Sequence, residues 1–406
     1  MSLAVVLLLV VACLGCMMVR PFNLPEAVPA LAGAALLVLF GAIGPQAALA
    51  AAGRGMQVYL FLTGMMLLAE LALLQGVFAW AAAHLAQLAR GAPATLFALV
   101  YGLAVLITVL LSNDATAVVF TPAVAAMAAA AGVKKPLPYL LICAFVANAA
   151  SFVLPISNPA NLVLFDGHMP RLGEWLGLFG LASLLSIAAT YVMLWLTQRG
   201  DLREKLRVPE EIPELTAGGR WTLAGLAGAA LLLILASGFG WPLGDLTCLL
   251  GIGSVMLVGI LARQPIWPVV RGVSWNVLPM VAGLFVMVGA LDDAGFTDRL
   301  AHLAQGGLAS TGVGLALLSN VANNLPVGLL AAHMFAGAGA GQKAAALIGV
   351  DLGPNLSVTG SLATILWLNA LRRQGLEMSA WRFLALGAVM MPPALMLALA
   401  GLWLSL

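Results

Sequence analysis

The chain has 406 residues, of which 63% are hydrophobic and 8% charged, and its formal net charge at pH 7 is +2. Ordinary soluble proteins carry about 25% charged residues. Together with a mean hydropathy of +1.06, this composition indicates a polytopic membrane protein without a large soluble domain. The four cysteines show no metal-binding spacing. We therefore predict lipid as a partner, no metal, no cofactor and no nucleic acid.

Apolar stretches long enough to cross a bilayer, about 20 residues each, recur along the chain. The first is read as a membrane helix and not as a signal peptide, because no Lys or Arg precedes it and no clear small-residue cleavage site follows. Two of the later stretches contain polar residues and are predicted to be interrupted helices, 137–165 and 344–371. The full set of predicted spans is 3–19, 27–44, 57–82, 137–165, 174–197, 221–239, 244–262, 275–291, 344–371 and 380–404.

Two further apolar stretches, 94–131 and 307–336, carry polar residues at their midpoints. They contain the strings TVLLSNDATAVVFTP and LLSNVANNLP. Lipid does not tolerate unpaired polar backbone, so an interrupted helix at membrane depth must face protein or a water-filled cavity. Each stretch is predicted to be a re-entrant helical hairpin, with its tip at Ser112–Asn113 or at Ser319–Asn320.

The basic residues predict the orientation of the chain. If the N-terminus lies outside, all 18 Lys and Arg residues except Arg54, Arg171, Arg299 and Lys343 fall in the cytoplasm, as the positive-inside rule requires. Both termini are then periplasmic or exterior. The polar segment 200–220 is predicted to be a flexible cytoplasmic linker.

The two sides of this linker resemble each other. Ser112–Asn113 in the first half matches Ser319–Asn320 in the second, and each half contributes five spans and one hairpin. An odd number of spans inverts the second half, so we predict an all-α fold of two inverted repeats, 1–199 and 221–406, with a substrate site where they meet.

Four polar clusters, each beside proline or glycine, are expected to converge on that site. At each hairpin tip the return helix begins, and its free N–H groups and partial positive charge suit hydroxyl groups or an anion. A lone Ser or Asn in a membrane helix more often bonds to a neighbouring helix, but four clusters repeated across two halves favour a binding site. The predicted substrate-binding residues are Ser112, Asn113, Thr116, Asn148, Asn158, Ser319, Asn320, Asn323, Asn324, Thr359 and Ser361.

Ionisable residues inside a membrane are functional candidates. Asp114, at the first tip, is the preferred candidate for proton coupling, because a desolvated carboxylate can carry a proton through a transport cycle. Asp351, in the second interrupted span, is the next candidate. Glu70 is the third, although a helix–helix contact explains its position equally well.

The chain resembles a known family over nearly its whole length. The strings LLSNDATAVVFTP, LLSNVANNLP and IGVDLGPNLSVTGSLATILWL are similar to those of arsenite efflux permeases of the ArsB type, in the ion transporter superfamily. The resemblance implies a secondary transporter, not an enzyme, that exports arsenite and antimonite in exchange for protons. Some relatives join a cytosolic ATPase. Family function falls on Asn113, Asp114, Asn320, Asn323, Asn324, Asp351 and Ser361.

The chemistry of arsenite agrees with this resemblance. At neutral pH it is mainly an uncharged trihydroxide, which amides and hydroxyls hold loosely and three thiols would hold too tightly. Cys143, five residues before Asn148, is a candidate for direct contact with the metalloid. Two alternatives stay open: a sodium-coupled carboxylate or Na⁺/H⁺ carrier of the same superfamily, and a membrane subunit of an ATPase-driven arsenite pump that docks the ATPase on 200–220.

Overall fold

The computed structural model describes residues 2–165, 169–209, 213–297, 299 and 306–406. These residues are largely helical and contain no β-strand. The predicted all-α polytopic membrane fold is confirmed, because several described helices are long and apolar enough to cross a membrane. They are α4 (Met56–Leu74), α6 (Pro93–Leu110), α10 (Leu172–Gln198), α11 (Ala217–Phe239), α12 (Leu243–Leu261) and α20 (Ala380–Ser405).

Shorter helices complete the described part of the chain. They are α1 (Leu3–Val19), α2 (Ala27–Leu39), α3 (Pro45–Arg54), α5 (Val77–Leu88), α7 (Thr121–Ala130), α8 (Leu137–Ala149), α9 (Pro159–Leu164), α13 (Trp267–Gly272), α14 (Val277–Asp293), α16 (Leu308–Ala322), α17 (Asn324–Met334), α18 (Ala340–Leu352) and α19 (Leu362–Arg373). Single turns of 3₁₀ or π helix connect several of them: η1 (Pro21–Asn23), η2 (Ala115–Phe120), η3 (Pro155–Ser157), η4 (Gly353–Asn355) and η5 (Val358–Gly360).

The first hairpin is interrupted where the sequence predicts. α6 ends at Leu110, the chain leaves the helix at Leu111 and Ser112, and it continues through the π-helical turn η2 into α7. The Ser112 hydroxyl and the Asn113 side chain accept hydrogen bonds from the N–H groups of Ala115 and Asp114. Such local bonds let Ser and Asn compete with helical backbone pairing.

The second hairpin turns later than predicted. Ser319 and Asn320 lie inside α16, and the chain reverses at Asn323, between α16 and α17. Their side chains donate to the carbonyl oxygens of Leu315 and Ala316, four residues earlier, at 2.9 and 2.8 Å. Bonds of this kind are compatible with a continuing helix, so a Ser-Asn pair alone does not fix the tip.

Both predicted interrupted spans are confirmed as broken helices. The first consists of α8 and α9, and the second of α18 and α19. α9 begins after Asn158 and α19 after Ser361, and each of these residues accepts a hydrogen bond from the N–H two positions further on. These are N-caps, which satisfy donors that a helix start leaves free.

One predicted span is wrong in its extent. The stretch 57–82 is two helices, because α4 ends before Gln75 and Gly76 separates it from α5. Gly76 has φ +71°, a left-handed conformation that glycine adopts without steric cost. The short helices α3 and α13 were not predicted. α3 packs on α14, and α13 packs on α4.

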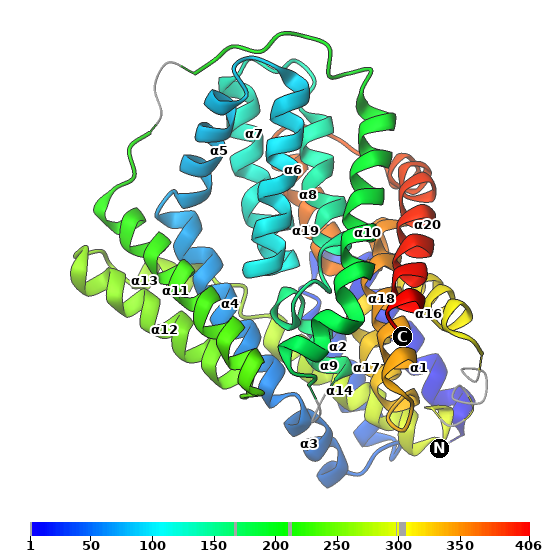
Figure 1. Ribbon diagram of the computed structural model, residues 1–406. Helices are drawn as coiled ribbons and strands as arrows, with labels where there is room; N and C mark the ends of the chain where they lie inside the picture. The colour runs from blue at the N-terminus through cyan, green and yellow to red at the C-terminus, as the bar shows by residue number, and fades with distance from the viewer. Residues whose placement is uncertain (1, 166–168, 210–212, 298, 300–305) are drawn as a thin grey trace.

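Contacts between the two halves come in matching pairs. α4 packs on α12 and α14 packs on α2, while α10 and α20 lie against each other. The turn η2 of the first hairpin contacts α19, and α17 of the second hairpin contacts α9. In Figure 1, α6, α7, α8 and α19 form a group beside α10 and α20, and α4, α11 and α12 form a second group. Each hairpin thus meets the broken helix of the other half.

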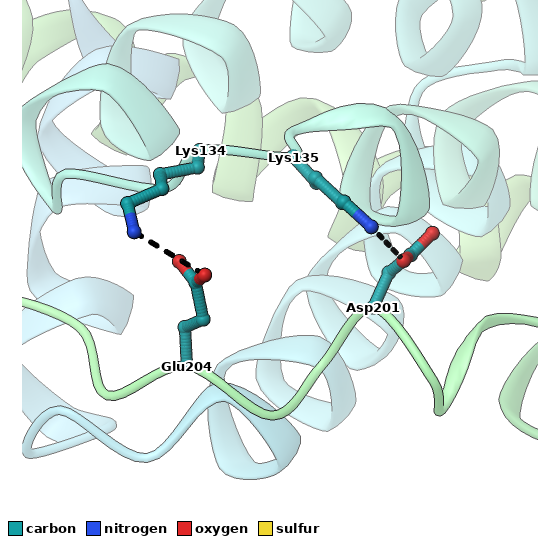
Figure 2. Close-up of polar contacts among 4 residues, drawn as sticks. All are labelled: Lys134, Lys135, Asp201 and Glu204. Carbon is teal, nitrogen blue, oxygen red and sulfur yellow. Dashed lines mark hydrogen bonds and ion pairs between the residues drawn. The ribbon is translucent and has the colours of Figure 1, made fainter.

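The segment between the halves is partly anchored. It crosses one end of the molecule above α5–α7 (Figure 1), and the backbone N–H groups of Leu206 and Arg207 donate to the carbonyl oxygens of Gly91 and Ala131. Figure 2 shows two ion pairs here, Lys134–Glu204 at 3.3 Å and Lys135–Asp201 at 2.6 Å. Residues 210–212 lie outside the described residues, and 217–220 already belong to α11.

Candidate functional site

One cavity collects residues from all four helix breaks. Asn113 and Asp114 reach it from the first hairpin tip, and Asn323 and Asn324 from the second. The caps of the two broken helices, Asn158 and Ser361, also line it. The cavity encloses about 740 Å³, including its open side, and its other walls are mainly apolar side chains of α1, α4, α14 and α19.

The first tip presents amide and carboxylate groups. Asn113 is 3% and Ser112 4% exposed, and both also bond to the backbone of the tip. Thr116 is not part of the cavity lining. Its hydroxyl lies 2.8 Å from the hydroxyl of Thr108 and joins η2 to α6. We find no described residue that donates a hydrogen bond to the Asp114 carboxylate.

The second tip depends on an unusual backbone conformation. Asn323 has φ +71° and ψ 150°, a region that is essentially restricted to glycine and costs about 1–3 kcal/mol elsewhere. Its side-chain oxygen accepts from the N–H of Leu325, and its amide nitrogen lies 3.4 Å from the carbonyl oxygen of Thr359. The strained residue therefore joins the hairpin tip to the second helix break.

Asn320 and Thr359 support this tip from outside the cavity. The Asn320 amide donates to the carbonyl oxygen of Gly353 at 2.9 Å and accepts from the Ser357 hydroxyl at 2.7 Å. The Thr359 hydroxyl donates to the carbonyl oxygen of Asn320 at 2.9 Å. Neither residue belongs to the cavity lining, so both act on its shape.

A buried hydrogen-bond network joins the two broken helices. Asp351 is fully buried, and its carboxylate oxygens lie 2.7 Å from the Ser151 hydroxyl and 2.8 Å from the Asn158 amide nitrogen. Beside it, the Asn148 amide donates to the side-chain oxygen of Asn355 at 3.0 Å. Because buried polar groups left without partners are costly, this network fixes Asn158 at the cavity edge.

The remaining predicted residues lie in other places. Ser319 is buried and bonds within α16. Cys143 is buried in α8 and lines neither this cavity nor its neighbour among the described residues. Glu70 lines the neighbouring cavity, which Asp114 also lines.

Sequence reasoning missed Glu26 and Asn355. Glu26 lines the cavity and forms an ion pair with Arg20, in the turn between α1 and α2. The position of a charged pair between two apolar helices was a signal for it, whereas Asn355 becomes visible only through its contact with the other half of the chain. Asn161 holds the first break together, because its amide donates to the carbonyl oxygens of Ser151 and Leu154.

Broken helices whose polar ends meet in one cavity at the interface of two halves are the arrangement of a membrane transporter, and the comparisons with known proteins agree. The arsenical pump membrane protein of Escherichia coli (strain K12) is 32% identical over 358 residues, covering 82% of each chain. The protein of the same name from Yersinia enterocolitica gives the same values. An uncharacterized transporter of Mycobacterium tuberculosis (strain ATCC 25618 / H37Rv) is 28% identical over 379 residues, or 87% of this chain and 86% of the relative.

Residues 6–352 match the family described as citrate transporter, CitMHS. The chain belongs to this family, and it is also similar to arsenical pump membrane proteins of the ArsB type. A solved structure, the YdaH transporter of Alcanivorax borkumensis, shares the fold with a TM-score of 0.55 at 16% identity, covering 88% of this chain and 86% of that one.

Proposed function

We propose that the chain exports arsenite, and also antimonite, in exchange for protons across the bacterial cytoplasmic membrane. The observation that carries this proposal is the cavity that joins Asn113, Asn158, Asn323 and Ser361 beside Asp114. Amide and hydroxyl groups suit a small neutral trihydroxide that must be held weakly and released. Among its described lining residues the cavity contains no cysteine, so these residues offer no thiols that would bind arsenite too tightly for release.

Asp114 is the residue to which we assign coupling. Its carboxylate faces the cavity and receives no hydrogen bond from the described residues, whereas both oxygens of Asp351 have partners. A free carboxylate can exchange a proton for a hydrogen bond from a bound hydroxyl group. We assign Asp351 to positioning Asn158, and the hydroxyls and amides of the tips to binding the substrate.

The orientation and repeat division belong to the same proposal. We place both termini outside, the segment 200–216 in the cytoplasm, and the halves in inverted orientation on either side of it. The matched packing of α4 on α12 and of α14 on α2 supports this division, and alternating access would move the hairpins against the helices that flank the cavity.

Proteoliposomes containing the purified protein test the proposal. We expect wild-type protein to take up labelled arsenite while a trapped pH-sensitive dye records proton movement in the opposite direction. Asp114→Asn should abolish the coupled proton movement, whereas Glu377→Gln, in an exposed loop outside the cavity, should match wild type. Absence of arsenite uptake by wild type, or full coupling in Asp114→Asn, would contradict the proposal.

A sodium-coupled carboxylate carrier is the main alternative, since the family is described as citrate transporter. The lining of the cavity argues against it. No lysine or arginine occurs among its described residues, and the nearby Arg20 is paired with Glu26. Sodium-dependent citrate uptake that arsenite does not inhibit would favour this alternative.

An ATPase-driven pump, with the linker as docking site, is the second alternative. The ion pairs of Lys134 and Lys135 occupy two acidic residues of the linker, Glu204 and Asp201. Arsenite transport by the purified chain, without ATP or any other protein, would show that a motor subunit is not required.

A further inference from the structure

A second cavity adjoins the first and contains a different carboxylate. Its lining includes Glu70 of α4, Ser112 of the first tip and Ser274, which precedes α14. It encloses about 690 Å³, including its open side, and has no asparagine among its described lining residues. It therefore lacks the amide groups that characterise the first cavity.

The two cavities meet at a shared wall. Among the residues that line both, Asp114 is the one with an ionisable side chain; the full set is Leu62, Asp114, Pro159, Val277 and Leu362. Each cavity adds one glutamate of its own, Glu26 in the first and Glu70 in the second. Asp114 thus stands between a chamber lined with amides and a chamber that contains Glu70.

The two glutamates differ in their surroundings. Glu26 is paired with Arg20, but no hydrogen bond or ion pair from the described residues reaches the Glu70 carboxylate. Asp114 is the other ionisable side chain among the described residues that line this second cavity. Further ionisable residues on the helices packed against α4 lie outside the cavity lining: Arg54, His84, Arg220, Asp245, Cys248, Arg271, Asp292 and Asp293.

We propose that substrate and proton reach Asp114 through separate chambers, and that Glu70 is the proton relay of the second chamber. This proposal rests on the proposed function. An Asp114 carboxylic acid loses its proton through water to the Glu70 carboxylate, and Glu70 then releases that proton to bulk water and becomes a carboxylate again. In the orientation that we propose, α13 and the adjoining end of α4 place this release on the cytoplasmic side.

The backbone of α13 positions Glu70. A Cβ atom added to Gly272 would collide with the Glu70 carboxylate, and α13 packs against α4. Any side chain at 272 must therefore displace the carboxylate group without removing it. This supplies a second variant, Gly272→Ala, that changes the relay through its geometry alone.

Proteoliposomes separate the two routes. For Glu70→Gln we expect arsenite exchange at equal pH on both sides, which needs no net proton movement, to stay within about twofold of wild type. Arsenite-driven proton movement should fall at least tenfold, and Gly272→Ala should show the same split to a smaller extent. The matched controls are Glu377→Gln and Gly102→Ala, since Gly102 has open space around its Cβ position. Equal loss of exchange and proton movement in Glu70→Gln would overturn the proposal.

A substrate-independent measurement keeps this proposal distinct from the proposed function. A hydrophobic carbodiimide reacts with protonated carboxyl groups in apolar surroundings, and peptide mass spectrometry locates the adduct. We expect Glu70 to be modified in wild type, more at low pH, whether or not arsenite is present. Lack of modification at Glu70, or its full protection by arsenite, would contradict separate chambers. If wild-type protein did not transport arsenite but Glu70 were still modified, the proposed substrate would be wrong and the proposed proton chamber would stand.

Discussion

At the scale of single residues, Asp351, which is buried, and Asp114, which is partly exposed, occupy contrasting environments. Asp351 is held by Ser151 and Asn158, whereas Asp114 faces two cavities without a hydrogen-bond donor among the described residues. Ionisable groups at membrane depth cost free energy, so those that occur there are usually paired or have a function. The pairing of Asp351 explains its presence structurally, and the lack of pairing at Asp114 leaves function as the explanation.

Substitution of Asp351 tests this distinction. In Asp351→Asn, the amide oxygen can still accept from Asn158, and the amide nitrogen can donate to Ser151, whose hydroxyl lies 2.7 Å from the carbonyl oxygen of Asn148. We therefore expect near-normal thermal stability and retained coupling. Asp351→Ala leaves buried donors unpaired and should lower the free energy of unfolding by about 1–3 kcal/mol, measured by thermal unfolding in detergent. Loss of coupling in a stable Asp351→Asn protein would make Asp351 a proton carrier.

Asn323 allows stability and function to be separated. Asn323→Gly relieves the strained backbone at φ +71°, so we expect unchanged or higher thermal stability. The same change removes the side-chain amide from the cavity, and arsenite uptake should fall at least about tenfold, the effect of roughly 1.4 kcal/mol. Asn323→Ala should lose both properties. Normal uptake by Asn323→Gly would show that this residue is kept for its backbone alone.

At the scale of elements, glycines bring helices into contact. A Cβ atom at Gly349 of α18 would collide with the backbone of Gly312 in α16, and one at Gly64 of α4 would collide with the backbone of Thr247 in α12. Small residues let membrane helices approach closely and pack well. α16 belongs to the second hairpin, so this contact also sets the position of its tip.

The contact between α16 and α18 can be tested with a matched pair of substitutions. Gly349→Ala inserts a methyl group against backbone that cannot move aside, and overpacking of this kind costs about 1–3 kcal/mol. Gly314→Ala, on the exposed face of α16 with open space around it, should be neutral or stabilising by up to about 1 kcal/mol, because alanine favours helix. Thermal unfolding of both variants provides the comparison. Equal stability of the two would contradict the close packing.

Local sequence signals predicted the elements unevenly. The first break was found because Ser112 and Asn113 bond to their own backbone, which is a local property. The second tip was misplaced because Ser319 and Asn320 can also bond backward within a helix. The division between α4 and α5 was missed, although Gly76 was visible, because a single glycine also occurs inside helices. α3 and α13 were too short to register as spans.

At the scale of the whole molecule, the sequence predicted that the four helix breaks meet, but it did not predict which side chains would form hydrogen bonds there. Repeated polar clusters predicted convergence, and the cavity contains residues from every cluster. The Asn148–Asn355 and Asp351–Asn158 bonds join positions about 200 residues apart, and no local pattern specifies such partners. Glu26 was overlooked although the charged pair that it forms with Arg20 between two apolar helices was a local signal, because its place in the cavity lining is set by the fold.

The anchored linker should respond to salt and hardly to pH. The hydrogen bond and charge of Asp201 raise the pKa of Lys135 above its ordinary value of 10.5. The stabilising contribution of a raised pKa is complete below the unfolded value and is lost only as pH rises through the higher folded value. Between about pH 6 and about pH 9 Lys135 therefore stays charged.

Trypsin provides the measurement, because the linker contains Arg203, Lys205 and Arg207. We expect cleavage there to be nearly constant over that pH range after correction for protease activity. It should accelerate at about 1 M salt, where the screening length falls to roughly 3 Å. The double variant Asp201→Asn/Glu204→Gln should be cleaved quickly at low salt as well. A linker equally resistant in all conditions would show that the backbone bonds of Leu206 and Arg207 suffice.

Because residues 206 and 207 bond to Gly91 and Ala131, the start and the finish of the first hairpin share one strip of chain. These two residues are therefore bound to the first hairpin, although their sequence resembles that of a spacer. Anyone who expresses the protein as two complementing fragments should accordingly cut beyond residue 209 and not at 199. A cut at residue 199 would separate the first hairpin from residues 206 and 207, whose backbone hydrogen bonds hold the two ends of that hairpin at a fixed distance.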